Sequence, residues 1–181
     1  MKSSPNMPNP PPISRPPNKA GKTLTPRLPP AALNDQTPMQ AKWISQNPRT
    51  LAVVFDRGDE LVGGLDQVAG EFRLAGSHFT GIGACRELTV GFFDRQTREY
   101  QRCLFREQME ILSLVGDIAE GGHGPVVHAH VVAGRADFTT HGGHLLHGLV
   151  WPTLEVIIVE SPRHLRRVFN PEVKLALIDL S

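Results

Sequence analysis

The fold is decided by the stretch from residue 126 to residue 149, which contains VVHAHVVAG (126–134) and, after a short polar connection, THGGHLLHGL (140–149). Five of the eight histidines of the chain lie in this stretch. His128 and His130 are two positions apart in an apolar run rich in β-branched residues, a pattern that predicts a strand. Because strand side chains alternate between faces, both imidazoles should lie on one face, roughly 6.5–7 Å apart along the strand.

A third histidine turns this strand into a candidate metal site. His144 follows Gly142 and Gly143, and the Gly-Gly-His segment predicts a turn. An imidazole from that turn could join His128 and His130 on one divalent cation and leave a position open for water or a ligand. Zinc is the default cation for a nitrogen-rich site, and only neutral imidazole binds it, so affinity should fall as pH drops through about 6.5. The alternative is that all three are ordinary histidines hydrogen-bonded to the backbone.

Two further residues are candidates for moving a proton beside such a cation. Glu155 lies in the predicted strand 153–160, which could return next to the site. His147 lies three residues beyond His144 and could serve as a base or as a hydrogen-bond partner of a ligand. The alternative for Glu155 is an exposed strand carboxylate. The sequence leaves open whether the chain is an enzyme.

The composition is that of a soluble globular protein, with 40% hydrophobic and 20% charged residues in 181. No apolar run approaches the roughly 18–20 residues that a membrane span needs, and no signal-peptide core lies near the start. Cys85 and Cys103 show no CxxC spacing, which favours buried thiols in a reducing compartment. We therefore expect a cytoplasmic protein that makes no membrane contact.

The charge of the chain is unevenly distributed. Residues 1–48 hold six basic residues and one acidic residue, whereas residues 49–181 hold 13 basic and 17 acidic residues, a net charge of −4. Affinity for DNA of any sequence comes mainly from Lys and Arg that neutralise phosphates, so this body does not have the charge of a non-specific DNA binder. Its one compact basic cluster, residues 163–167, is expected to be a solvated face.

The chain divides into a Pro-rich tail, residues 1–48, and a folded domain, residues 49–181. Eleven of the sixteen prolines lie in residues 1–38, and this composition predicts disorder. Within the domain we expect one main helix, capped by Asp56 or Asp59 and ending near Leu74. The other periodic segments predict strands over residues 50–55, 77–84, 87–93, 98–105, 109–119, 126–134, 153–160, 166–169 and 174–179. One helix with many strands indicates an α+β fold with a mixed or antiparallel sheet.

Five short motifs, in their order and spacing, resemble the PPC (plants and prokaryotes conserved) domain family. The resemblance covers about residues 49–169, and its motifs are GIGA (81–84), FD (93–94), MEILSLVG (109–116), VHAH (127–130) and GGHLL (142–146). It implies an α+β fold packed as a homotrimer. In prokaryotic members the equivalent histidines resemble a metal site, which maps here onto His128, His130 and His144.

The resemblance also frames the expected function. Plant members join the domain to AT-hooks, and no Arg-Gly-Arg-Pro hook is present here. Prokaryotic members usually stand alone and are often labelled DNA-binding proteins; many carry an acidic residue where this chain has His147. We therefore expect a stand-alone trimeric binding module with a histidine metal site and a DNA-associated or regulatory role. The alternative is a metal-dependent enzyme of hydrolase or lyase type that acts on a small molecule at the three-histidine site.

Overall fold

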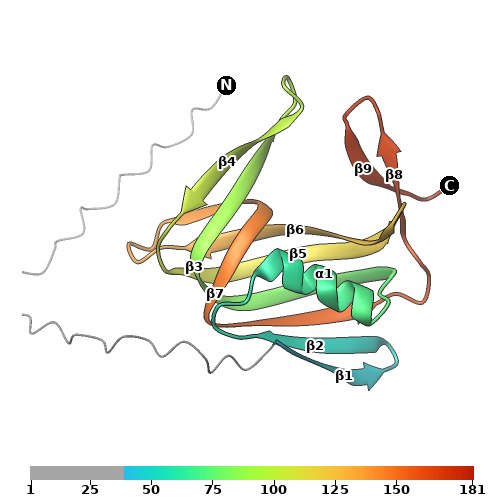
Figure 1. Cartoon of the computed structure of the whole chain (residues 1–181), viewed down its shortest axis with the longest axis horizontal. Coiled ribbons are helices and arrows are strands. Elements are labelled where there is room, and N and C mark those ends of the chain that lie inside the picture. Colours follow the sequence, from blue (N-terminus) through green and yellow to red (C-terminus); the bar gives the residue numbers. More distant parts are fainter. Residues whose placement is uncertain (1–38) are drawn as a thin grey trace, which may run out of the picture. The chain divides into compact units, whose positions relative to one another are not determined.

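The computed structural model describes residues 39–181, which form one helix and nine strands (Figure 1). In chain order these are β1 (Gln40–Gln46), β2 (Arg49–Phe55), α1 (Leu61–Glu71), β3 (Gly76–Asp94), β4 (Glu99–Phe105), β5 (Met109–Gly121), β6 (Gly124–Gly134), β7 (Thr140–Glu160), β8 (Arg166–Asn170) and β9 (Leu175–Asp179). The prediction of a mixed sheet with one helix is confirmed. At 11 residues, α1 is the only helix in residues 39–181, and it is not long enough to cross a membrane.

The strands form a single sheet in the order β1-β2-β7-β3-β5-β8-β9, with β4 added to β3 and β6 paired with both β5 and β7. All of these pairings are antiparallel except the one between β5 and β8, which is parallel and consists of the single pair Glu120–Arg166. The long strand β7 changes partners along its length. Its first residues, 140–144, pair with β6, and residues 154–159 pair with β2.

The helix begins later and ends earlier than its apolar spacing predicts. Its N-cap is Glu60, whose carboxylate accepts hydrogen bonds from the backbone N–H groups of residues 62 and 63, so the prediction of Asp56 or Asp59 is wrong. Asp59 instead accepts a hydrogen bond from the Asp56 backbone N–H within a preceding turn. At the other end Arg73 adopts a φ of 52°, and this left-handed residue stops the helix before Leu74.

The first strand begins nearer the N-terminus than expected. The boundary placed at residues 48 and 49 is wrong, because β1 pairs with β2 from Gln40 onward. Trp43 explains this pairing, since its ring packs edge-on against Phe72 and beneath the guanidinium of Arg49. The disorder predicted for the Pro-rich tail falls, over residues 1–38, outside the described residues.

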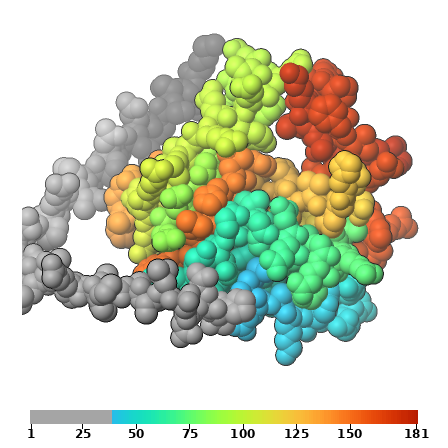
Figure 2. All heavy atoms as spheres, viewed as in Figure 1, coloured from blue at the N-terminus to red at the C-terminus, as the bar shows by residue number. Residues whose placement is uncertain are grey.

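The two faces of the sheet differ in what covers them. On one face α1 packs against β6 and β7, and its Leu65 and Val68 join a fully buried core that includes Phe55 and Leu154. Figure 2 shows α1 spread over this near face of the domain. The other face, here called the outer face, carries no helix in residues 39–181. Paired residues in an antiparallel ladder share a face, so the pairing register shows which side chains lie there.

Candidate metal centre

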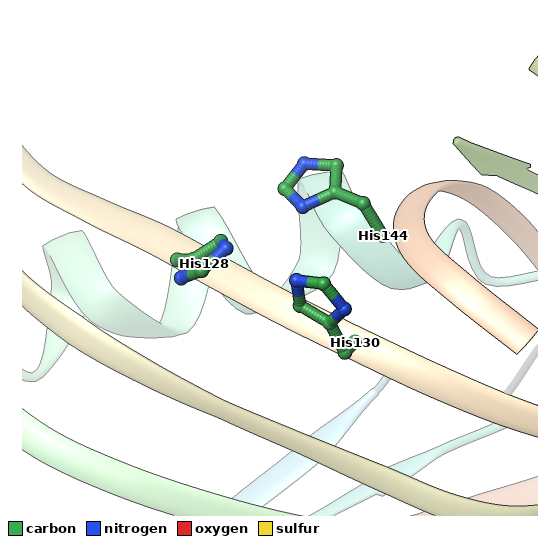
Figure 3. Close-up of side chains that lie close together, drawn as sticks. All are labelled: His128, His130 and His144. Atoms are coloured by element: carbon green, nitrogen blue, oxygen red, sulfur yellow. The ribbon is translucent and has the colours of Figure 1, made fainter. Parts of the chain in front are cut away.

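Three histidines converge on the outer face. His128 and His130 project from β6, and His144 lies directly opposite His130 on β7 (Figure 3). One ring nitrogen from each residue lies within 4.8 Å of the corresponding nitrogens of the other two. The expected shared face of His128 and His130 follows from the period of the strand, because Ala129 between them points into the core.

His144 lies inside a strand, so the predicted Gly-Gly-His turn is wrong. The turn that joins β6 to β7 comes earlier, where the backbone N–H of Arg135 donates to the carbonyl of Thr139. Gly142 and Gly143 serve close strand packing instead. A Cβ atom on Gly142 would lie 2.7 Å from the Val131 carbonyl oxygen, closer than real Cβ contacts allow, and one on Gly143 would crowd the carbonyl of β3 on the other side.

The rings are packed against one another and against one aromatic side chain. The three imidazole centroids are 5.2–5.4 Å apart. Tyr100 of β4 stacks on His144 at 4.6 Å with an interplanar angle of 22°. Gly91, the β3 partner of His144, leaves room for this stack, since a Cβ atom there would lie 2.8 Å from the Tyr100 ring. The orientation of His144 is therefore fixed by packing.

Burial keeps two of these imidazoles neutral. Burial first, and then the neighbouring His128 and His130, together lower the pKa of His144 from its usual 6.5 to about 4. The pKa of His130 is also lowered, first by burial and then by His128. At neutral pH these rings therefore offer free lone pairs, which is the state that binds a cation.

One unsatisfied atom indicates what the cluster fits. Nδ1 of His144 is buried and has no hydrogen-bond partner among residues 39–181. Buried polar atoms without a partner are rare in folded proteins and need an explanation. A cation bound between the three rings would supply one, and borderline-soft divalent metals prefer such a set of imidazole nitrogens. Because His130 is exposed, a cation held there would keep one side open.

Two residues that the sequence did not single out lie next to the cluster. Asp117 of β5 pairs with His128 in the sheet, and its Oδ2 lies 3.5 Å from Nδ1 of that histidine. Arg167 of β8 donates to the other oxygen of Asp117 at 2.6 Å, and its side chain is 7% exposed. The expectation that the basic cluster at 163–167 is simply a solvated face is therefore wrong for Arg167. The sequence signal for Asp117 is that a single acidic residue lies between the apolar residues Val115 and Ile118 of a predicted strand.

The two proton-transfer candidates do not join the cluster. Glu155 lies on the outer face but on the far half of β7, separated from β6 by β3 and β5, roughly 14 Å at the usual strand spacing. It lines a separate surface pocket of about 400 Å³. His147 points to the helix side, where Nδ1 is 3.1 Å from Glu60 and Nε2 is 3.6 Å from Glu87.

Solved structures share this fold. A protein from Bacteroides thetaiotaomicron, provisionally described as DNA-binding, is 30% identical and has a TM-score of 0.74; the match covers 78% of this chain and 97% of that one. A protein from Archaeoglobus fulgidus described as metal-containing is 28% identical with a TM-score of 0.67, over 77% of this chain and 96% of that one.

A much longer curated relative matches part of the chain. The bifunctional protein GlmU of a Synechococcus strain is 32% identical over 109 residues, which are 59% of this chain. The chain spans only 16% of the length of that relative.

The family itself follows from a match over most of the described residues. Residues 44–162, from the middle of β1 to just beyond β7, match the Plants and Prokaryotes Conserved domain, and this range contains all three clustered histidines. The resemblance expected from the short motifs is thereby confirmed. The chain belongs to the Plants and Prokaryotes Conserved (PCC) domain family.

Proposed function

We propose that this protein is a metal-binding module in which His128, His130 and His144 hold one divalent cation, zinc in the first instance. The observation that carries the proposal is the convergence of three imidazoles around a buried nitrogen that has no partner in residues 39–181. The metal-containing relative from Archaeoglobus supports it. When bound, the cation would supply a Lewis acid or a site for an additional ligand.

The proposal includes a homotrimer that covers the outer face. The face carries a set of aliphatic side chains that are each 40–62% exposed: Val54, Ile82, Val115, Val132 and Ile157. The solvent side of an antiparallel sheet is normally polar, and contiguous exposed apolar patches mark interfaces. Val115 pairs with His130, so the patch reaches the histidines and a neighbouring subunit would lie beside the site. Light scattering should give three times the chain mass, and Val115→Glu should give a smaller species.

DNA is the macromolecular partner that we propose for this module. The support is the family and the Bacteroides relative provisionally described as DNA-binding. The net charge of −4 over residues 49–181 predicts weak binding that high salt abolishes. A fluorescent duplex titrated at low and at physiological salt tests this. Lack of binding at low salt would remove DNA as the partner and leave the metal site unaffected.

A metal-dependent enzyme of hydrolase or lyase type is the second candidate. The observation that favours it is the exposure of His130, which gives a small molecule access to a cation with an open position. Neither Glu155 nor His147 lies within reach of the cluster, so no candidate base comes from those positions. We therefore place the binding module first.

Metal analysis of untagged protein tests the central proposal. We expect about one zinc per chain in the wild type after dialysis against trace zinc, and far less in His128→Ala and His144→Ala. His141→Ala is the matched control, because His141 packs on Phe105 outside the cluster. Wild-type protein without stoichiometric metal, or equal metal in all four proteins, would overturn the proposal.

A further inference from the structure

The C-terminal hairpin formed by β8 and β9 lies outside the residues that match the family, 44–162, yet it reaches the metal centre. Figure 1 shows this hairpin standing off from the main sheet. Its attachment is slight. It includes the pair Glu120–Arg166, the contacts of Arg167, and two backbone hydrogen bonds of Leu165. In these two bonds the Glu120 N–H donates to the Leu165 carbonyl, and the Leu165 N–H donates to the Ala75 carbonyl.

Arg167 is held from both sides. Its Nη2 donates to Asp117 at 2.6 Å, and its Nη1 donates to the Ala176 carbonyl of β9 at 2.9 Å. The side chain is buried although its strand neighbours Arg166 and Val168 are exposed. A buried guanidinium in a charge-assisted bond to a carboxylate is a geometrically specific contact. Through it the hairpin fixes where the carboxylate of Asp117 lies.

Asp117 in turn lies beside Nδ1 of His128. A histidine that binds a metal usually donates its other ring N–H to a carboxylate, which fixes both the tautomer and the ring orientation. Here Oδ2 of Asp117 faces Nδ1 of His128 at 3.5 Å, so a proton on Nδ1 leaves the lone pair of Nε2 for the cation. Oδ1 is occupied by Arg167, which keeps Oδ2 turned toward the histidine.

We propose that Arg167 is a positioning residue of the metal centre, which acts through Asp117 to hold His128 as the Nδ1–H tautomer with Nε2 ready to bind. The C-terminal hairpin thereby sets the metal affinity of ligands that lie within the family-matched residues. This inference rests on the proposed metal site. The proposed role of the hairpin is to position Asp117 and His128 through Arg167, which goes beyond its strand pairing.

Zinc affinity, measured by competition with a chromophoric chelator on the full chain, tests the role. We expect Arg167→Gln and Asp117→Asn each to bind zinc about 10–100-fold more weakly, the usual cost of losing the partner of a ligand. The double variant should be no weaker than Asp117→Asn alone, because both changes break one chain of contacts. Arg166→Gln is the matched control from the same strand, and Arg167→Lys, which keeps the charge, should fall between.

The tautomer of His128, read from its ¹⁵N chemical shifts in metal-free protein, is a measurement that a merely structural hairpin would not move. Wild type should show the Nδ1–H form and Arg167→Gln a mixture. Unchanged zinc affinity and an unchanged tautomer in Arg167→Gln, or equal losses in Arg166→Gln, would overturn the inference. A wild type without zinc would overturn the metal proposal, while the tautomer comparison would still decide whether Arg167 positions His128.

Discussion

Replacing His144 with phenylalanine should stabilise the metal-free protein and destabilise the metal-loaded one relative to wild type. The substitution removes a buried ring nitrogen that has no partner in residues 39–181 and keeps an aromatic ring against Tyr100. It also removes one of the three proposed ligands. The sign of the effect therefore depends on whether a cation is present, which a structural histidine would not show.

The magnitudes follow from the two roles of this nitrogen. A buried polar group without a partner costs about 1–3 kcal/mol, and the half-buried His144 falls at the lower end. One kcal/mol corresponds to roughly 2–4 °C in Tm for a protein of this size, so metal-free His144→Phe should melt about 2–4 °C higher. Zinc at one hundred times Kd stabilises wild type by about 2.7 kcal/mol, or roughly 5–11 °C. The variant should gain little, so the order of the two proteins reverses.

Thermal melts followed by circular dichroism, in chelator and in excess zinc at one fixed protein concentration, give the Tm of wild type and of His144→Phe with and without metal. His141→Phe is the control, since His141 lies on the same strand but contacts Phe105 and no ligand. It should gain as much from zinc as wild type does. A His144→Phe protein that melts below wild type without metal, and gains the same increase from zinc, would refute both roles assigned to this residue.

Three further predictions concern the surroundings of the cluster. Because burial and the neighbouring His128 and His130 lower the pKa of His144 from 6.5 to about 4, the unfolded chain binds a proton in this window that the folded chain does not. Denaturant melts of metal-free protein at pH 7.5, 6 and 5 should therefore show wild type losing stability relative to His144→Phe as the pH falls, with a constant difference above pH 7. Glu60→Ala removes the helix cap and should cost about 1 kcal/mol in the same assay while zinc affinity stays constant. Gly116→Ala would place a Cβ atom against the His128 carbonyl and should cost about 1–3 kcal/mol and weaken zinc binding, whereas Gly122→Ala, which meets nothing within 4 Å, should do neither.

The part of the site that sequence predicts is the part set by local periodicity. His128 and His130 share a face because residues two apart on any strand do so. The sequence also predicts that His144 joins them, but it does not predict that His144 lies in a paired strand, because a Gly-Gly pair usually marks a turn. The hairpin turn instead lies at residues 135–139, and counting outward from it places residue 144 opposite residue 130. The polar segment 135–139 between the two apolar runs is therefore the sequence feature that sets the register of this hairpin. The pair Gly142-Gly143 instead indicates a turn at the wrong place.

The supports of the site depend on contacts that no local pattern encodes. Arg167 reaches Asp117 across fifty positions of sequence, from a hairpin joined to β5 by one residue pair. Periodicity in residues 166–169 predicts a strand but not the partner of its arginine. The same limit explains why Glu155, on the predicted strand 153–160, lies far from the cluster. Strand order, which places β3 and β5 between Glu155 and β6, is a property of the whole sheet.

Metal binding and subunit association should favour one another in this protein. His130 is exposed in the single chain, and the partial desolvation of its ring is already the chief cause of its lowered pKa. A subunit packed over the aliphatic patch beside it would desolvate the ring further, which disfavours the protonated form that cannot bind a cation. Because coupling between two binding equilibria is reciprocal, zinc must then tighten the association of subunits by the factor that association tightens zinc. Sedimentation of dilute protein with and without zinc measures this factor, and equal dissociation in both would show that the patch and the histidines act independently.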